Sequence, residues 1–171
     1  MTSFRTAFAL LLPLLLLYLL VPPTASAQQE AGDTELQFSG SAQTTTESST
    51  TTVITNAKVG QYFTRSLQIG VTTSLTATFP ENEEAEYGGR GGVFFNYSFL
   101  SGDATTVPYL GGQYSRSLES DADQGNAGIN GGFKFYLNRR TALDVGGNYL
   151  FPLEETGSGV VLFQFGISFI L

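Results

Sequence analysis

From Val160 to Leu171 the chain reads VVLFQFGISFIL, and this stretch carries its clearest periodic signal. Large apolar side chains occupy every second position, and Gln164, Gly166 and Ser168 lie between them. Successive side chains of a β-strand point to opposite faces, whereas a helix would group apolar residues three and four apart. The stretch therefore predicts a strand with one strongly apolar face. That face consists of Val161, Phe163, Phe165, Ile167, Phe169 and Leu171.

The apolar face of this strand must be covered by a large protein core or by lipid. A transmembrane β-strand needs about 9 to 11 tilted residues, with apolar side chains facing lipid and small or polar ones facing the barrel interior. Residues 160–171 satisfy this requirement along their whole length. An edge strand of a soluble sandwich or of a lipocalin-like barrel is the alternative that this stretch alone leaves open.

The N-terminal residues have the three parts of a secretory signal peptide. Arg5 supplies the positive charge, an apolar run follows from Ala7 to Val21, and Ala25-Ser26-Ala27 is a small-x-small cleavage site. A retained anchor is the alternative, but the run is shorter than the ~20 residues of a spanning helix and contains Pro13. We therefore predict a signal peptide over residues 1–27 and one mature domain over residues 28–171.

Composition excludes several classes of function. The formal charge of −7 becomes −8 once the signal peptide and its single charged residue, Arg5, are removed. This acidity argues against nucleic acid as a partner, because phosphate binding needs clustered Lys and Arg. The sequence contains no cysteine and no histidine, which removes disulfides, the commonest general base and imidazole metal ligands. We therefore expect no catalytic site, no cofactor and no built metal site.

Alternation of apolar and polar residues recurs along the whole mature domain and is broken at regular intervals by turn residues. No helical period of comparable length appears after the signal peptide. The phase of the fifth segment is ambiguous: we prefer Pro108, Leu110 and Tyr114 on the outer face, and the opposite assignment remains open. Eight strands are predicted at about 35–44, 53–63, 67–79, 87–99, 106–118, 126–137, 142–151 and 160–171.

The connections between the predicted strands fall into two alternating sets. Those at 64–66, 101–105 and 138–140 are short, and those at 45–52, 80–86, 119–125 and 152–159 are longer. An even number of antiparallel strands with short turns at one end and longer loops at the other is typical of an outer-membrane barrel. Ten of the fifteen acidic residues lie in or beside the longer set. They are Glu47, Glu81, Glu83, Glu84, Glu86, Glu119, Asp121, Asp123, Glu154 and Glu155.

With these features the chain resembles the small eight-stranded outer-membrane β-barrels of the OmpA-, OmpX- and OmpW-like group. The resemblance is carried by the signal peptide, by the stretch Pro108 to Gly112, by Gly131 to Leu137 before a short turn, and by the terminal strand. It departs from that pattern in ending with Leu171 where many relatives end with Phe, and in having no Trp for the interfacial girdles. The terminal strand resembles the family's assembly signal, here Phe165, Ile167, Phe169 and Leu171.

The resemblance implies an all-β fold, an eight-stranded antiparallel up-and-down transmembrane β-barrel, in the outer membrane of a Gram-negative type envelope. Its implied partners are outer-membrane lipids and lipopolysaccharide, and the barrel-assembly machinery during insertion, for a protein that is monomeric. A structural or surface-interaction role is our first hypothesis. A porin-like barrel for small solutes or hydrophobic compounds and a soluble lipocalin-like carrier are the alternatives.

The alternation also places charged side chains in the barrel interior. If the turn 138–140 closes a hairpin with Leu137 opposite Thr141, then Lys134 lies opposite Asp144, and both share the face of Asn130 and Asn148. We expect this pair to form an ion pair that helps to plug the lumen, because an isolated charge in so narrow a space would be costly. A wet position near the rim is the alternative. The predicted lumen charges are Lys58, Arg90, Lys134 and Asp144, with Glu35 as a further candidate.

Overall fold

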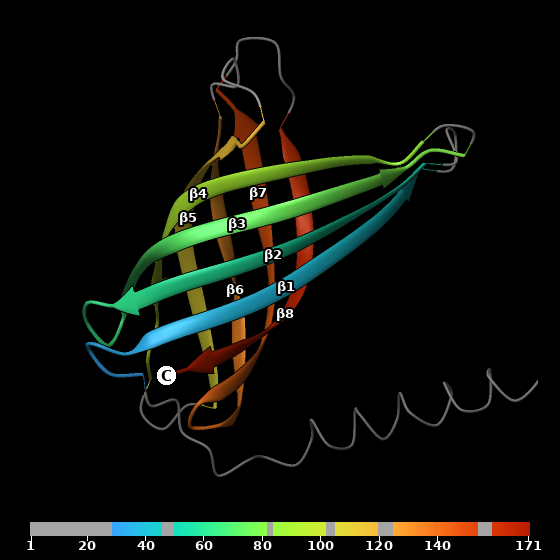
Figure 1. Ribbon diagram of the computed structural model, residues 1–171. Helices are drawn as coiled ribbons and strands as arrows, with labels where there is room; N and C mark the ends of the chain where they lie inside the picture. Colours follow the sequence, from blue (N-terminus) through green and yellow to red (C-terminus); the bar gives the residue numbers. More distant parts are fainter. Residues whose placement is uncertain (1–28, 46–49, 82–83, 102–104, 120–124, 154–158) are drawn as a thin grey trace, which may run out of the picture.

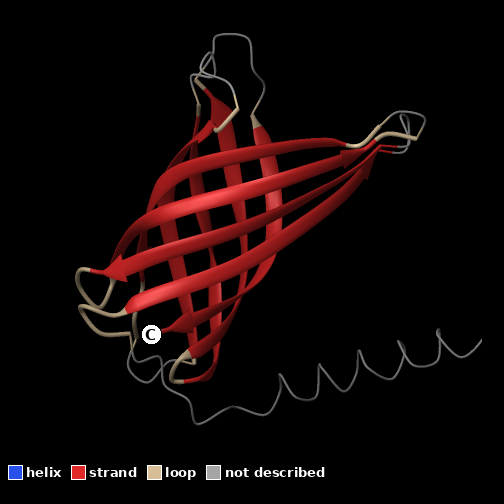
Figure 2. Cartoon of the chain, viewed as in Figure 1, coloured by secondary structure: helices blue, strands red, loops and turns tan. Residues whose placement is uncertain are grey.

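The computed structural model is a closed barrel of eight antiparallel strands, in which each strand pairs with its neighbours in sequence and β1 pairs with β8 (Figures 1 and 2). It describes residues 29–45, 50–81, 84–101, 105–119, 125–153 and 159–171. Among these residues, no helix is long and apolar enough to cross a membrane. The strands are β1 (Thr34–Thr45), β2 (Thr50–Tyr62), β3 (Leu67–Phe79), β4 (Glu86–Ser98), β5 (Thr106–Ser117), β6 (Asn126–Asn138), β7 (Thr141–Pro152) and β8 (Val160–Ile170).

The predicted fold class and the eight predicted strands are confirmed, because period-two alternation marks each strand in the sequence. Boundaries differ by up to three residues, most at the start of β2, where a run of threonines hides the pattern. The predicted signal peptide, residues 1–27, lies outside the described residues.

The distribution of polar and apolar side chains between interior and surface is inverted relative to a soluble domain. Most of the buried side chains are polar or charged, whereas large apolar side chains cover the outside of the barrel. Phe163, Phe165 and Leu75 have 74%, 68% and 63% of their surface exposed. In the fifth strand Leu110 and Tyr114 point outward, as we preferred. The polar interior follows from the same alternation that puts the apolar residues outside.

The two ends of the barrel differ, as Figure 1 shows. Short hairpins close one end, where Thr64 Oγ1 accepts hydrogen bonds from the backbone N–H groups of Leu67 at 2.9 Å and Ser66 at 3.2 Å. In the turn between β6 and β7, Asn138 Oδ1 accepts from the Arg140 N–H at 2.8 Å. The longer connections lie at the other end, and residues 46–49, 82–83, 120–124 and 154–158 of these connections are outside the described part of the chain.

A small apolar cluster underlies the polar interior at the short-turn end. Val107, Tyr136, Ala142 and Ile170 are buried against one another, with Leu100 packed beside them. These residues come from the short-turn ends of β5, β6, β7 and β8, so the cluster joins four consecutive strands of the barrel.

Candidate functional site: the polar lumen

An ion pair between strands that are not neighbours crosses the barrel interior. Lys134 Nζ on β6 lies 2.6 Å from both carboxylate oxygens of Glu35 on β1. The Tyr62 hydroxyl on β2 donates to Glu35 Oε2 at 2.5 Å, and Lys134 Nζ also donates to the Tyr62 oxygen at 3.1 Å. Each of the three side chains is almost completely buried. Because β1 pairs with β2 and β8, the contact from β1 to β6 spans the lumen.

The expected hairpin register is present, but the expected ion pair is wrong. Lys134 and Asp144 are register partners across β6 and β7. The Lys134 ammonium nevertheless reaches across the lumen to Glu35, and Asp144 Oδ1 instead accepts the Tyr109 hydroxyl at 2.9 Å. The turn is also tighter than expected, since Asn138 rather than Leu137 pairs with Thr141 after a register irregularity. A long, flexible Lys side chain can reach carboxylates on several strands, so the strand register alone does not determine which carboxylate it binds.

Glycines make room for Tyr109 beside the ion pair. A Cβ atom on Gly146 would lie 2.7 Å from the Tyr109 hydroxyl oxygen, and one on Gly132 would lie 3.0 Å from it. The Tyr109 ring in turn lies 5.7 Å from Lys134 Nζ, as does the Tyr62 ring. Gly132 and Gly146 therefore have a packing role, in which they allow the Tyr109 side chain to lie beside the ammonium group.

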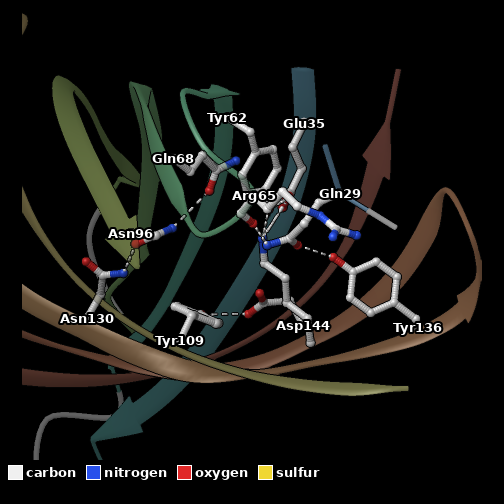
Figure 3. Close-up of polar contacts among 11 residues, drawn as sticks. Gln29, Glu35, Tyr62, Arg65, Gln68, Asn96, Tyr109, Asn130, Tyr136 and Asp144 are labelled. Carbon is white, nitrogen blue, oxygen red and sulfur yellow. Dashed lines mark hydrogen bonds and ion pairs between the residues drawn. The ribbon is translucent and has the colours of Figure 1, made fainter. Parts of the chain in front are cut away.

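Two hydrogen-bonded chains of side chains extend this network, as Figure 3 shows. Asn130 Nδ2 donates to Asn96 Oδ1 at 2.6 Å, and Asn96 Nδ2 donates to Gln68 Oε1 at 3.2 Å. These three side chains cross the interior from β6 through β4 to β3. Such a chain fills a narrow barrel with paired polar groups in place of water.

The second chain lies at the short-turn end and involves the segment before β1. The Tyr136 hydroxyl donates to Gln29 Oε1 at 2.7 Å, and Gln29 Nε2 donates to the Arg65 carbonyl oxygen at 2.7 Å. Gln29 is almost fully buried. Gln29, Tyr62 and Tyr109 were not among the predicted lumen residues. For the two tyrosines the available signal was their position on the polar phase of a strand, and for Gln29 there was none.

The other two predicted lumen charges lie farther from the short turns. Lys58 is 4% exposed, and its Nζ lies 5.3 Å from the centre of the Phe94 ring. Arg90 is half-buried and donates through Nη2 to the Ser115 carbonyl oxygen at 3.2 Å. Both line a cavity of about 90 Å³ that continues toward Ile54 and Thr76. The five charged side chains are thus divided between two halves of the lumen.

The residues expected to form an assembly signal lie on the last strand and face mainly outward. Phe165, Phe169 and Leu171 are exposed, and Ile167 is half-buried. β8 pairs with β7 along most of its length and with β1 over residues 165–170, so it closes the barrel. Because it pairs with both β7 and β1, β8 is required for closure of the barrel.

The arrangement defines a small up-and-down β-barrel with a polar interior. No family model and no curated protein matches the sequence. Among solved structures, the N-terminal β-barrel domain of Pseudomonas aeruginosa OprF matches with a TM-score of 0.60 and 14% identity, covering 84% of this chain and all of that one. Neisserial surface protein A (NspA) matches with a TM-score of 0.57 and 16% identity, covering 82% of this chain and 97% of its own.

A third match, the outer membrane protein OprG from Pseudomonas aeruginosa, has a TM-score of 0.50 at 11% identity and covers 87% of this chain and 99% of that one. The predicted resemblance to small eight-stranded outer-membrane barrels is therefore confirmed for the fold. At these identities the likeness concerns the fold alone.

Proposed function

We propose that this chain is an integral outer-membrane protein with a structural or surface-interaction role, whose lumen is closed by its own side chains. The inverted polarity of the barrel carries this proposal, since a soluble protein would not expose so many large apolar side chains. The strands contain 11 to 13 residues, and about 9 to 11 tilted residues cross a bilayer. The soluble lipocalin-like alternative is disfavoured for the same reason.

Aromatic residues near both ends of the barrel support the membrane placement. Tyr97 and Phe99 meet edge to face with ring centres 5.2 Å apart at the short-turn end. Tyr149 and Phe151 lie 6.2 Å apart at the end of the longer connections. Aromatic girdles at both interfaces are typical of outer-membrane barrels, and here Tyr and Phe take the place of Trp.

The closed lumen favours a structural or surface role over a porin-like one. The Lys134–Glu35 pair and the chain from Asn130 to Gln68 cross the interior in the half near the short turns. An eight-stranded barrel has an interior just wide enough for side chains to fill. Large, steady currents from the unmodified protein in a planar bilayer would favour the transport alternative.

Charging the outer face at its middle tests the membrane wall. Phe165→Arg places a cation halfway along β8, where it should cost about 2–4 kcal/mol of folding free energy in a bilayer. Leu118→Arg is the matched control, because Leu118 has the same 68% exposure but lies beyond the end of β5, where the cost should fall to about 0–1 kcal/mol. Urea unfolding in liposomes and heat-modifiability of the membrane fraction on gels measure both. Equal effects of the two changes, or an unmodified mature protein that stays monomeric without detergent, would exclude the membrane proposal.

The assembly role of the last strand is tested by comparing cells with liposomes. Phe169→Ala keeps the backbone bonds that close the barrel, such as that from the Leu171 N–H to the Thr34 carbonyl at 2.8 Å. If assembly machinery recognises the aromatic side chain, the variant should reach the outer membrane in a reduced amount while refolding normally into liposomes. A parallel loss in both assays would indicate a packing role only.

A further inference from the structure

The half of the lumen beyond the ion pair contains a cavity that its side chains do not fill. Its volume is about 90 Å³, several times the ~10–15 Å³ that a single water requires. Lys58 and Arg90 provide its charged lining, and Asn148 and Gln164 lie on the wall formed by β7 and β8. Hydroxyl groups complete the lining, from Ser41, Thr72, Ser74, Thr76 and Ser115.

Lys58 is the most unusual member of this lining. It is buried, with 4% of its surface exposed, and the Phe94 ring lies 5.3 Å from its ammonium nitrogen. Among the described residues, no side chain or carbonyl group forms a hydrogen bond or ion pair with Lys58 Nζ. Buried charges in proteins are almost always paired. The ammonium group therefore requires a partner that the barrel wall does not provide.

The charge balance of the lumen indicates the sign of that partner. Among the described residues, the interior contains the cations Lys58, Arg90 and Lys134 and the carboxylates Glu35 and Asp144. Lys134 already binds Glu35. None of the described residues that line the cavity is acidic. The positive charge of Lys58 consequently faces a cavity without a described acidic lining residue, and one monovalent anion would neutralise it.

An unsatisfied amide donor points to the same kind of ligand. Asn148 Nδ2 donates to Gln164 Oε1 at 3.0 Å, which leaves Gln164 Nε2 and Asn148 Oδ1 without partners among the described residues. Exchanging the oxygen and nitrogen of both amides reverses the bond and again leaves one NH₂ group unpaired. Both side chains are more than nine-tenths buried and line the cavity. An anion between Lys58 and this amide would satisfy both donors.

We propose that the loop-side half of the lumen binds one monovalent inorganic anion of halide size, with Lys58 as its main charged contact and Arg90 as the second cation. A monovalent anion suits the site because Lys58, for which no hydrogen bond or ion pair is found among the described residues, carries a single positive charge. It does not depend on the membrane location, since all of these groups lie inside the barrel.

Bromide serves as the probe, because it replaces chloride and scatters anomalously. Crystals of the unmodified barrel soaked in bromide should show one anomalous peak within hydrogen-bonding distance of Lys58 Nζ. The peak should be absent from Lys58→Gln and retained in Arg139→Gln, which removes an exposed turn cation. Only water in the cavity at saturating bromide, or an unchanged peak in Lys58→Gln, would overturn the proposal.

A solution measurement keeps the test independent of crystals. The unfolding midpoint of the detergent-solubilised barrel is titrated with bromide against gluconate, a bulkier organic anion, at constant ionic strength. The apparent affinity for bromide should be at least about tenfold weaker in Lys58→Gln, because a charge-assisted hydrogen bond is lost. Equal bromide dependence of the unmodified protein, Lys58→Gln and Arg139→Gln would mean a general salt effect, and the site would be rejected.

Discussion

The two halves of the lumen solve the problem of a narrow polar interior differently. Near the short turns, the Lys134 ammonium binds Glu35 between two tyrosine rings, and Asp144 accepts the Tyr109 hydroxyl. Toward the longer connections, Lys58 faces an unfilled cavity. One half is closed by opposite charges in contact, and the other retains space beside cations. Opposite charges in contact across an eight-stranded barrel close its interior to solutes. Two cations instead repel each other, and the space beside them requires a ligand or water.

This difference also assigns separate roles to the two halves. The closed half joins β1, β2 and β6 and so ties together opposite walls of the barrel. The open half has no such contact across the lumen from Lys58 among the described residues. We therefore expect substitutions in the closed half to lower stability strongly and substitutions at Lys58 to change mainly what the barrel binds.

The largest effect is expected for Glu35→Gln. This change keeps the shape of the side chain and a hydrogen-bond acceptor for Tyr62 but leaves the Lys134 ammonium buried without its counter-charge. Removing one partner of a buried ion pair typically costs about 3–5 kcal/mol. Urea unfolding of the barrel in lipid, followed by circular dichroism, gives the free energy.

A double variant separates loss of the pair from loss of packing. Glu35→Gln combined with Lys134→Met removes both charges, so that no charge is left buried without its partner. The double variant should therefore recover most of the stability lost by Glu35→Gln alone. If the single variant is as stable as the unmodified barrel, the ion pair does not hold the closed half together.

A smaller effect is expected for Asp144→Ala, which leaves the Lys134–Glu35 pair intact. The substitution leaves the Tyr109 hydroxyl without its acceptor, at a cost of about 1–3 kcal/mol. In planar bilayers the unmodified barrel should pass little current, and the variant should show at most small, irregular openings, because the ion pair still crosses the lumen. Steady channels from Asp144→Ala would show that Asp144, rather than the pair, closes the barrel.

The fold could be predicted from the sequence because the alternation within each strand shows which residues face inward and which face outward. Alternation predicted eight strands and their inward and outward residues, and the short turn at 138–140 predicted the strand register in which Lys134 lies opposite Asp144. Local signals of this kind need no knowledge of the rest of the barrel.

The site could be predicted only in part, because its central contact is not local. Glu35 and Lys134 are 99 residues apart and lie on strands that do not pair. Which side chains meet across the lumen depends on the stagger of the whole closed barrel, and one sequence does not show that stagger. The same reasoning applies to the space beside Lys58, since a cavity is a property of all the side chains around it.

The smallest effect is expected for Lys58→Met in buffer with gluconate as the only anion. The substitution loses the contact between the ammonium and the Phe94 ring, which contributes about 0.5–2 kcal/mol, but it also removes the cost of burying an unpaired charge. These two contributions oppose each other, and no carboxylate is left without a partner. The free energy of unfolding should therefore change by less than about 1 kcal/mol. Urea unfolding under the conditions used for Glu35→Gln measures it directly. A loss as large as that of Glu35→Gln would mean that Lys58 takes part in the charge network of the closed half, and the contrast between the two halves of the lumen would then be wrong.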